Sequence, residues 1–378
     1  MPLSRRLAAL ALSSLVALTI AGCAASPGQT QVPEPEPAET LPTPSELEAA
    51  VERSLDSSGV PGAAVIVTAA DGASSVVVMG EAAPGRPVEP ETRFAYRSIT
   101  KSLVGTVVLQ LAAEGRVDLD APVSDFVDGV PGGDDITVEQ LGAMRSGIAN
   151  YSAQPGLGEL LSRDPAREPG VSELLALAYA ESPVFSPGSA YEYSNTNTLL
   201  LGEIIERATG DSWVSQVDER IARPLGLESL EYGFLDPEFD ATGFALDHGE
   251  AVEELPVVAP GWFGAAGGLT GDVSDLADWG RALGSGSLVD EAAQRERIRS
   301  LGSIADDPAS PFYDRYGFAL GELEGWLGHT GNGLGFQSLV MYDPESERVA
   351  AILINGTGED PDLPAAVFAD LLDVLPPA

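Results

Sequence analysis

The chain has 378 residues, of which 44% are hydrophobic and 21% charged, a composition that suits a folded protein with a sizeable core. Its 58 acidic residues outnumber 20 basic ones, and the formal net charge of −38 argues against binding to nucleic acid, whose phosphates it would repel. A single cysteine excludes an internal disulfide and any metal site built from several thiolates.

The start of the chain predicts export. Arg5 and Arg6 precede an apolar run over residues 7–22, which is shorter than the roughly 20 residues that a membrane span needs. The run ends at Cys23 in a pattern that resembles a bacterial lipobox, which implies a signal peptide over residues 1–22 and lipidation of the cysteine. The alternative is an ordinary secretory signal with a spare thiol. We expect an extracytoplasmic protein, anchored by lipid to the outer face of the cell membrane, or secreted if Cys23 is not lipidated.

A linker is predicted to follow the signal. Residues 23–44 are rich in Pro and Glu, which favours an extended spacer that cannot bury a core. The folded part then begins with an amphipathic helix over about 44–56, where Thr43 and Glu46 form a capping box around a proline.

Runs of β-branched residues near both ends of the chain predict two antiparallel hairpins. The first joins residues 63–69 to 74–79, and the second joins 336–342 to 348–354. A last helix is expected over about 363–375. Because both ends supply strands, we predict an α+β fold with one antiparallel sheet built from both chain ends and flanked by helices.

The middle of the chain predicts a mainly helical insertion. We expect this helical subdomain over residues 98–285, and a sheet subdomain formed by residues 45–97 together with 286–378. A functional site is expected between the two parts, where clefts commonly form.

The chain's only lysine stands three residues after a serine. Apolar residues at every fourth position from Ile99 to Leu111 predict a helix that ends at Gly115, and they leave Ser98 and Lys101 together on one side of its start. A partly desolvated ammonium beside a hydroxyl has a lowered pKa and can act as a base toward the serine. Taken alone, this spacing could be a coincidence.

A second motif precedes a helix predicted over 198–208. It contains Tyr193, which as a buried phenol beside a cation could become a phenolate and carry protons, and Asn195, which could bind a substrate amide. Taken alone, the motif favours a simpler interpretation, in which the tyrosine packs on the core and the asparagine caps the helix.

A third motif, residues 328–333, comes just before a predicted strand and contains His329, Thr330 and Asn332. Its glycines permit close approach of another backbone, and its N–H groups could face a developing oxyanion. The alternative is a plain glycine-rich turn. The other histidine, His248, matches no motif and is predicted to lie on a surface loop.

Together, the three motifs resemble in order and spacing the serine β-lactamase-like family of penicillin-recognising hydrolases. The similarity extends over about residues 45–375, and the subgroup it most resembles is that of the actinobacterial D-alanyl-D-alanine carboxypeptidases and class C-like esterases. The resemblance implies a β-lactamase/transpeptidase-like fold, an acyl-enzyme mechanism, no cofactor and no metal.

Carried over by position, the resemblance assigns the catalytic groups. Ser98 is the acylated nucleophile, Lys101 is its activating neighbour, and Tyr193 is the proton shuttle. Asn195 orients the substrate amide.

The resemblance also gives the third motif a role in substrate binding. His329 and Thr330 support Tyr193 and the carboxyl side of the substrate. The backbone N–H groups of Ser98 and Asn332 form the oxyanion hole.

The expected location and the subgroup favour a DD-carboxypeptidase that acts on peptidoglycan stem peptides. One feature opposes this, because recognition of a terminal carboxylate usually needs Arg or Lys, and residues 316–347 contain neither. Thr330 and Ser338 could substitute with hydroxyls, and His329 with charge.

Other activities therefore remain open. An esterase, a β-lactamase or an amidase for uncharged ends is one alternative, with Trp262 and Phe263 as a candidate apolar lining. A penicillin-binding sensor module that is acylated without turnover is another, although the intact Ser98, Lys101 and Tyr193 favour an enzyme. The chain has no G-x-S-x-G elbow and no His-Glu-x-x-His motif, which argues against an α/β-hydrolase and a zinc peptidase.

Overall fold

A computed structural model describes residues 41–56, 58–307, 311–358 and 362–376. The predicted signal peptide, Cys23 and all but the last residues of the predicted linker lie outside these ranges. Within them, no helix is both long and apolar enough to cross a membrane.

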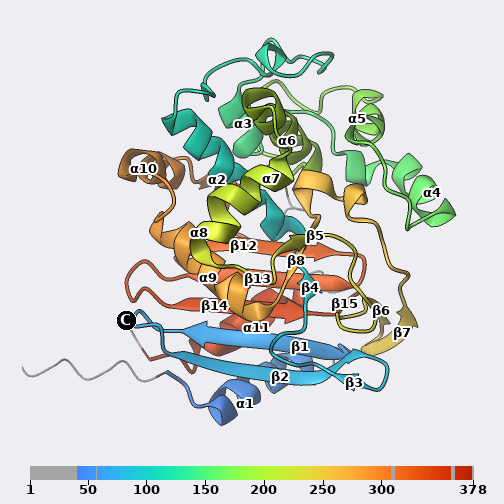
Figure 1. Cartoon of the computed structure of the whole chain (residues 1–378), viewed down its shortest axis with the longest axis vertical. Helices are drawn as coiled ribbons and strands as arrows, with labels where there is room; N and C mark the ends of the chain where they lie inside the picture. Colours follow the sequence, from blue (N-terminus) through green and yellow to red (C-terminus); the bar gives the residue numbers. More distant parts are fainter. Residues whose placement is uncertain (1–40, 57, 308–310, 359–361, 377–378) are drawn as a thin grey trace, which may run out of the picture. The chain divides into compact units, whose positions relative to one another are not determined.

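In the described chain, nine strands form one antiparallel sheet whose centre joins the two chain ends (Figure 1). β1 (Gly62–Thr68) pairs with β2 (Ser74–Ala83) on one side and with β14 (Val349–Ile354) on the other, and β14 pairs with β13 (Phe336–Tyr342). Both predicted hairpins and the α+β fold are thus confirmed, although β2 runs four residues beyond its predicted end. The strand order is β3 (Arg86–Pro87), β2, β1, β14, β13, β12 (Trp326–Gly333), β11 (Leu320–Leu323), β10 (Arg315–Gly317) and β9 (Gly302–Ser303).

Helices cover both faces of this sheet. α1 (Pro44–Leu55) and α11 (Leu363–Leu372) pack on one face, and α9 (Val273–Ser285) packs on the other. Because both faces are covered, every residue of β1 is buried, which explains its continuous apolar run. The capping box of Thr43 and Glu46 forms as predicted, and the last helix ends at Leu372 rather than near 375.

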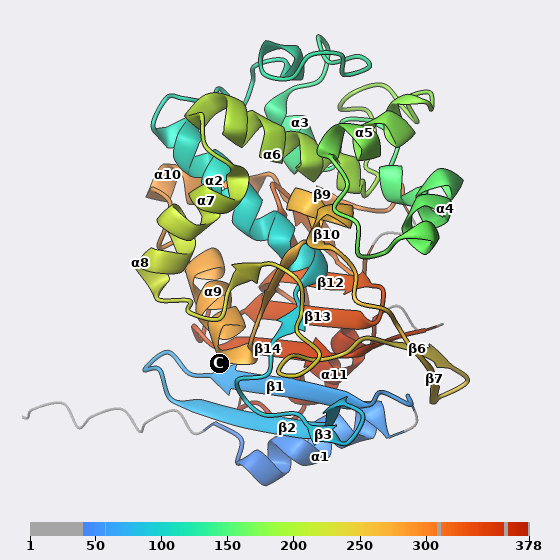
Figure 2. The ribbon, with the colours of Figure 1, turned by 45° about the vertical axis from the view of Figure 1, so that its right-hand side comes forward.

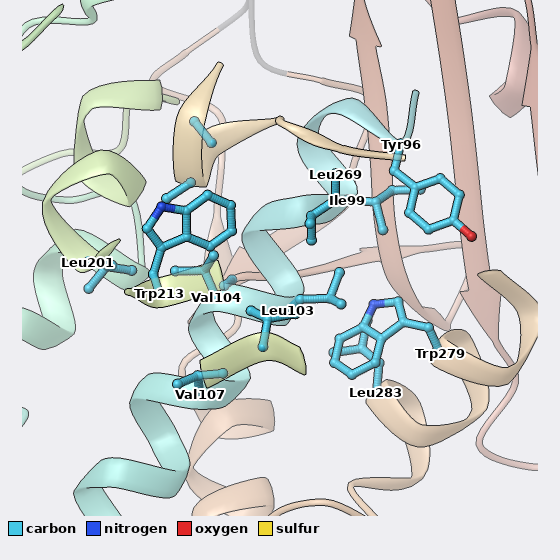
Figure 3. Close-up of a cluster of buried hydrophobic side chains, with 14 of the residues drawn as sticks. Tyr96, Ile99, Leu103, Val104, Val107, Leu201, Trp213, Leu269, Trp279 and Leu283 are labelled. Atoms are coloured by element: carbon cyan, nitrogen blue, oxygen red, sulfur yellow. The ribbon is translucent and has the colours of Figure 1, made fainter. Parts of the chain in front are cut away.

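The helical part is centred on α2 (Thr100–Ala113), which follows the 3₁₀ turn η1 (Arg97–Ile99) and packs against α6 (Asn195–Thr209). Figure 3 shows apolar side chains gathered around α2, including Ile99, Leu103 and Trp279. Because this core surrounds α2, the helix is buried on almost every side and its periodic apolar face is only part of what it buries.

Figures 1 and 2 both show the helices α3 to α7 gathered beyond β12, away from β1 and β2. The remaining α-helices are α3 (Val138–Gly142), α4 (Pro155–Arg163), α5 (Val171–Tyr179), α7 (Trp213–Val217), α8 (Arg223–Leu225) and α10 (Glu291–Arg299). The remaining short helical turns are η2 (Val123–Asp125), η3 (Tyr151–Ala153), η4 (Asp218–Ala222), η5 (Pro260–Trp262) and η6 (Gly264–Ala266).

The segment 98–285 is not helical throughout. Within this segment, α9 packs on the nine-stranded sheet, and several short strands lie in the second half of the segment. Together with one strand from each side of the segment, they form two small sheets. The first is ordered β4 (Phe94–Ala95), β8 (Leu269–Gly271), β5 (Glu231–Tyr232), and the second β15 (Gly356–Thr357), β6 (Phe244–Asp247), β7 (Glu250–Glu254).

Candidate functional site

The start of α2 brings the predicted nucleophile and its lysine into contact. Ser98 lies in η1 and Lys101 in the first turn of α2, and Lys101 Nζ donates to Ser98 Oγ at 2.8 Å and to the carbonyl oxygen of Ala266 at 2.6 Å. Lys101 is fully buried, and burial lowers its pKa well below the usual value. A lysine whose charged form is disfavoured in this way can accept the proton of the serine hydroxyl.

Tyr193, from the loop before α6, lies beside this pair. Its ring centre is 5.1 Å from Lys101 Nζ, and its hydroxyl is buried near that of Ser98 but makes no hydrogen bond of normal geometry with a described residue. Burial raises the pKa of the phenol strongly, and the nearby Ser98 hydroxyl opposes only part of that rise. The expected phenolate is therefore not supported, because burial keeps Tyr193 protonated and also disfavours the lysine cation that would stabilise its anion.

The third motif comes just before the strand β13, as expected, but it lies in a strand of its own rather than in a glycine-rich turn. Residues 328–333 form most of β12, which pairs with β13 and passes next to η1. A Cβ at Gly331 would lie 2.4 Å from the backbone oxygen of Tyr96, so only glycine allows β12 to approach the turn that carries Ser98 this closely.

His329 and Thr330 form a buried network with two tyrosines that no motif in the sequence had indicated. His329 Nδ1 lies 2.6 Å from the backbone oxygen of Thr330, and its Nε2 lies 3.0 Å from the Tyr316 hydroxyl. The Tyr313 hydroxyl lies 2.9 Å from Thr330 Oγ1 and accepts the Thr330 N–H at 2.7 Å. Burial lowers the pKa of His329 to about 3, so the ring is neutral at pH 7. The expectation that His329 supplies charge to the site is wrong for this reason.

A cleft of about 340 Å³ opens beside Ser98. Asn195 and Asn332 line it, so the structure brings three predicted site residues to one cavity. His329 and Thr330 are not among the described residues that line it. Asn195 is held in place by its side-chain nitrogen, which donates to Ser152 Oγ at 2.7 Å.

One wall of this cleft is apolar. Leu157 and Leu161 come from α4, and Trp262 and Phe263, the pair considered from the sequence, come from the turn at η5. Trp262 is fixed by its indole N–H, which donates to the carbonyl oxygen of Pro165 at 3.0 Å. Among the described residues that line the cleft, there is no carboxylate. The cleft is therefore suited to an apolar group rather than to a cation.

The cation in the cleft lining is Arg97, which we missed because we sought one only within residues 316–347. Its position directly before Ser98 was the available signal. His248 lies on the turn between β6 and β7 with 81% of its side chain exposed, as predicted for a surface loop. Within the described chain, no group of three or more His, Cys, Asp and Glu residues is arranged to bind a metal ion.

Comparison with known proteins identifies relatives over most of the chain. The family model described as Beta-lactamase matches residues 47–374. The chain is 27% identical over 323 residues to esterase EstB of Burkholderia gladioli, a match that covers 71% of this chain and 82% of the esterase. Several other curated relatives are longer proteins, and the chain spans about 63% of their length.

Solved structures agree with this match. A D-stereospecific amidohydrolase from Streptomyces sp. is 30% identical with a TM-score of 0.76, covering 87% of this chain and 98% of that one. A structure of SurE with D-Leu is 30% identical with a TM-score of 0.66, covering 88% of this chain and 75% of that one. The family model spans nearly all of the folded part of the chain, and these solved structures have the same fold as this chain. The chain therefore belongs to the beta-lactamase family of serine hydrolases.

Proposed function

We propose that the protein is a D-stereospecific serine peptidase or amidase that works through an acyl-enzyme on Ser98, with peptidoglycan stem peptides as its substrate class. The observation that carries this proposal is the 2.8 Å contact between Ser98 Oγ and the buried Lys101 Nζ, at the edge of a cleft. The names of two 30%-identical structures, a D-stereospecific amidohydrolase and SurE with D-Leu, support the preference for a D-residue.

In the proposed acylation step, Ser98 Oγ attacks the carbonyl carbon of the substrate and its proton passes to Lys101. The new C–O bond forms a tetrahedral intermediate, whose oxyanion is held by the backbone N–H groups of Ser98 and Asn332. The C–N bond then breaks, its electron pair leaves with nitrogen, and the amine takes a proton delivered through Lys101 and Tyr193.

In the proposed deacylation step, water replaces the amine. It attacks the ester carbonyl and gives a proton to the same Lys101–Tyr193 pair, and the C–O bond to Ser98 breaks as the serine regains its proton. The products are a carboxylic acid and the free enzyme. The protonated resting state of Tyr193 suits its role as a proton shuttle, because a neutral phenol can pass on one proton while it accepts another.

The alternative is an esterase or β-lactamase for substrates without a terminal carboxylate. The apolar wall of Leu157, Leu161 and Phe263 favours it, as does the neutral His329, which supplies no charge to bind a carboxylate. The relation to esterase EstB points in the same direction.

A substrate panel tests both proposals. Purified protein and its Ser98→Ala variant are assayed with an acylated D-Ala-D-Ala peptide, its L-Ala-L-Ala counterpart, D-leucine amide and a p-nitrophenyl ester. Turnover of the D-peptide that requires Ser98 and exceeds turnover of the L-peptide supports the peptidase. Turnover of the ester alone supports the esterase and contradicts the peptidase.

Labelling with a fluorescent penicillin, followed by a chase, tests the sensor alternative. An enzyme that turns over its substrates also hydrolyses its peptide or ester in the panel, whatever the lifetime of the penicillin label. Persistent label with no turnover of any panel member supports a module that is acylated without turnover and contradicts both enzyme proposals.

We also propose an extracytoplasmic location with a lipid anchor at Cys23. The support is the sequence of residues 1–23, which ends in a lipobox-like pattern. Expression of the whole chain with a radiolabelled fatty acid tests the anchor. Label should reach the wild-type protein and not the Cys23→Ala variant, which should leave the membrane fraction.

A further inference from the structure

Arg97 joins the turn that carries Ser98 to the end of β12. It is buried, with 7% of the residue exposed. Its Nε donates to the carbonyl oxygen of Gly333 at 2.8 Å, and its Nη2 donates to that of Leu334 at 3.2 Å. Gly333 ends β12 and Leu334 begins the turn into β13. One side chain therefore spans the two backbone segments that border the cleft.

Two aromatic rings hold the guanidinium. Its carbon lies 4.0 Å from the ring centre of Phe263 and 5.2 Å from that of Phe336, distances at which a cation is attracted to a ring face. Among the described residues, no carboxylate forms an ion pair with Arg97. Burial lowers its pKa to about 9, so it remains a cation at neutral pH. The contacts of Arg97 are therefore to backbone oxygens and ring faces.

The backbone of Arg97 is in an unfavourable conformation. Its φ is 51°, in the left-handed region of the backbone that residues other than glycine seldom adopt. Strain of this kind persists where surrounding contacts hold it, and it is concentrated at functional sites. Here it sits one residue before Ser98, so the contacts of the guanidinium also fix the direction in which the Ser98 backbone faces the cleft.

We infer that Arg97 is a positioning residue that sets the separation of the two halves of the oxyanion hole. This rests on the proposed function, in which the backbone N–H groups of Ser98 and Asn332 hold the oxyanion. Ser98 follows Arg97 in the chain, and Asn332 precedes Gly333, which accepts the Arg97 hydrogen bond. A displacement of about 1 Å in such a group costs roughly a hundredfold in rate.

Two variants separate the guanidinium from the backbone strain. Arg97→Gly removes the side chain and adopts the same φ without strain, whereas Arg97→Gln keeps a Cβ and the strain. The control is Arg281→Gln, because Arg281 also donates to backbone oxygens, those of Ala69 and Glu347, but is absent from the cleft lining. The measurements are kcat and KM on the best panel substrate, thermal unfolding, and the affinity for phenylboronic acid, which forms a tetrahedral adduct on a reactive serine.

Both Arg97 variants should lower kcat by about 10- to 100-fold and weaken phenylboronic acid binding by a similar factor, while KM changes less than about threefold. Arg281→Gln should keep kcat and lower only the unfolding temperature. Unchanged kcat in Arg97→Gly, or a kcat loss without loss of boronic acid affinity, overturns the inference.

Two further outcomes also decide the matter. A rise in KM confined to substrates with a terminal carboxylate overturns the positioning role, because it assigns Arg97 to substrate binding. If the wild-type protein shows neither turnover nor boronic acid binding that depends on Ser98, the proposed function fails. That failure is distinct, because it appears before any Arg97 variant is compared.

Discussion

The fully buried Lys101 places its Nζ 2.8 Å from Ser98 Oγ, and its other described hydrogen bond goes to the carbonyl oxygen of Ala266. A buried ammonium is costly, so burial lowers the pKa of Lys101 and favours its neutral form. The same burial that makes the lysine a poor cation makes it a usable base. The role proposed for Lys101 therefore follows from where the fold places it.

Replacing the base tests this role. Lys101→Met keeps an unbranched side chain, one atom shorter and without a basic nitrogen, and Lys101→Arg keeps a group that cannot lose its proton near neutral pH. Each variant should lower the acylation rate by about 10²- to 10⁴-fold, the range that general bases supply. Single-turnover kinetics with a p-nitrophenyl ester measure this rate. An active Lys101→Arg variant would show that Lys101 is not a base.

Removing the nucleophile is a separate test. Ser98→Ala should abolish covalent labelling and shift the melting temperature by only a few degrees.

The pH dependence of kcat/KM tests the lowered pKa of Lys101. Because burial moves that pKa well below the ordinary value of 10.5, the neutral base should form at lower pH than in a free lysine. The profile from pH 4 to 11 should rise on the acid side and become level well before pH 10.5. A profile that still rises toward pH 10 contradicts an active base with a lowered pKa. Circular dichroism at each pH separates this effect from unfolding.

Removing the hydroxyl of Tyr193 should have opposite effects on stability and activity. The group is buried without a described partner, and an unsatisfied buried hydroxyl costs roughly 1–3 kcal/mol. Tyr193→Phe should therefore unfold at a higher urea concentration while kcat falls by about 10²-fold or more.

A matched control exists in α5, where the Tyr179 hydroxyl is also buried without a described partner, whereas the Lys101 ammonium lies over the ring of Tyr193. Tyr179→Phe should gain stability and keep kcat. Equal activity in the two Phe variants would remove Tyr193 from the mechanism.

His329 should make the protein sensitive to acid. Its pKa is about 3 in the folded state against 6.5 for the ordinary residue, so the unfolded chain binds a proton first as the pH falls. The contribution to stability is therefore complete above pH 6.5 and is lost progressively between 6.5 and 3, by about 2–3 kcal/mol at pH 4.5.

Urea unfolding at pH 7 and pH 4.5 measures this loss. His329→Gln, which cannot be protonated, should lose less stability between the two pH values than the wild type by that amount. His248→Gln, which alters the exposed histidine, should respond like the wild type. An equal response of wild type and His329→Gln would mean that His329 is not buried as a neutral ring.

Much of the fold was predictable because its signals are local. The hairpins at both ends consist of β-branched residues bounded by turn residues, and the helix after Ser98 shows its period in the apolar positions. The pairing of β1 with β14 was predicted only in outline, since it joins segments almost 300 residues apart. The site was predictable to the extent that its residues form short motifs with fixed spacing.

What the sequence did not reveal depends on tertiary contacts. β12 is rich in glycine, which has a low strand propensity, and it forms because β13 pairs with it and the turn at Ser98 packs against it. His329 is neutral because it is buried, with its ring nitrogens in contact with the hydroxyls of Tyr313 and Tyr316, which precede it by 16 and 13 residues. Charge states and close backbone approaches of this kind are properties of the packed molecule.

The apolar wall of the cleft should select the substrate side chain. Leu161 lines the cleft from α4, and replacing it with serine removes apolar contact without adding a charge. Leu161→Ser should raise KM about tenfold for a substrate with a D-Leu or D-Phe side chain, change it little for D-Ala, and leave kcat near the wild-type value. The control is Leu177→Ser on α5, a partly buried leucine outside the cleft lining, which should affect stability only. If Leu161→Ser changes KM equally for all three side chains, this wall does not contact the side chain that distinguishes the substrates.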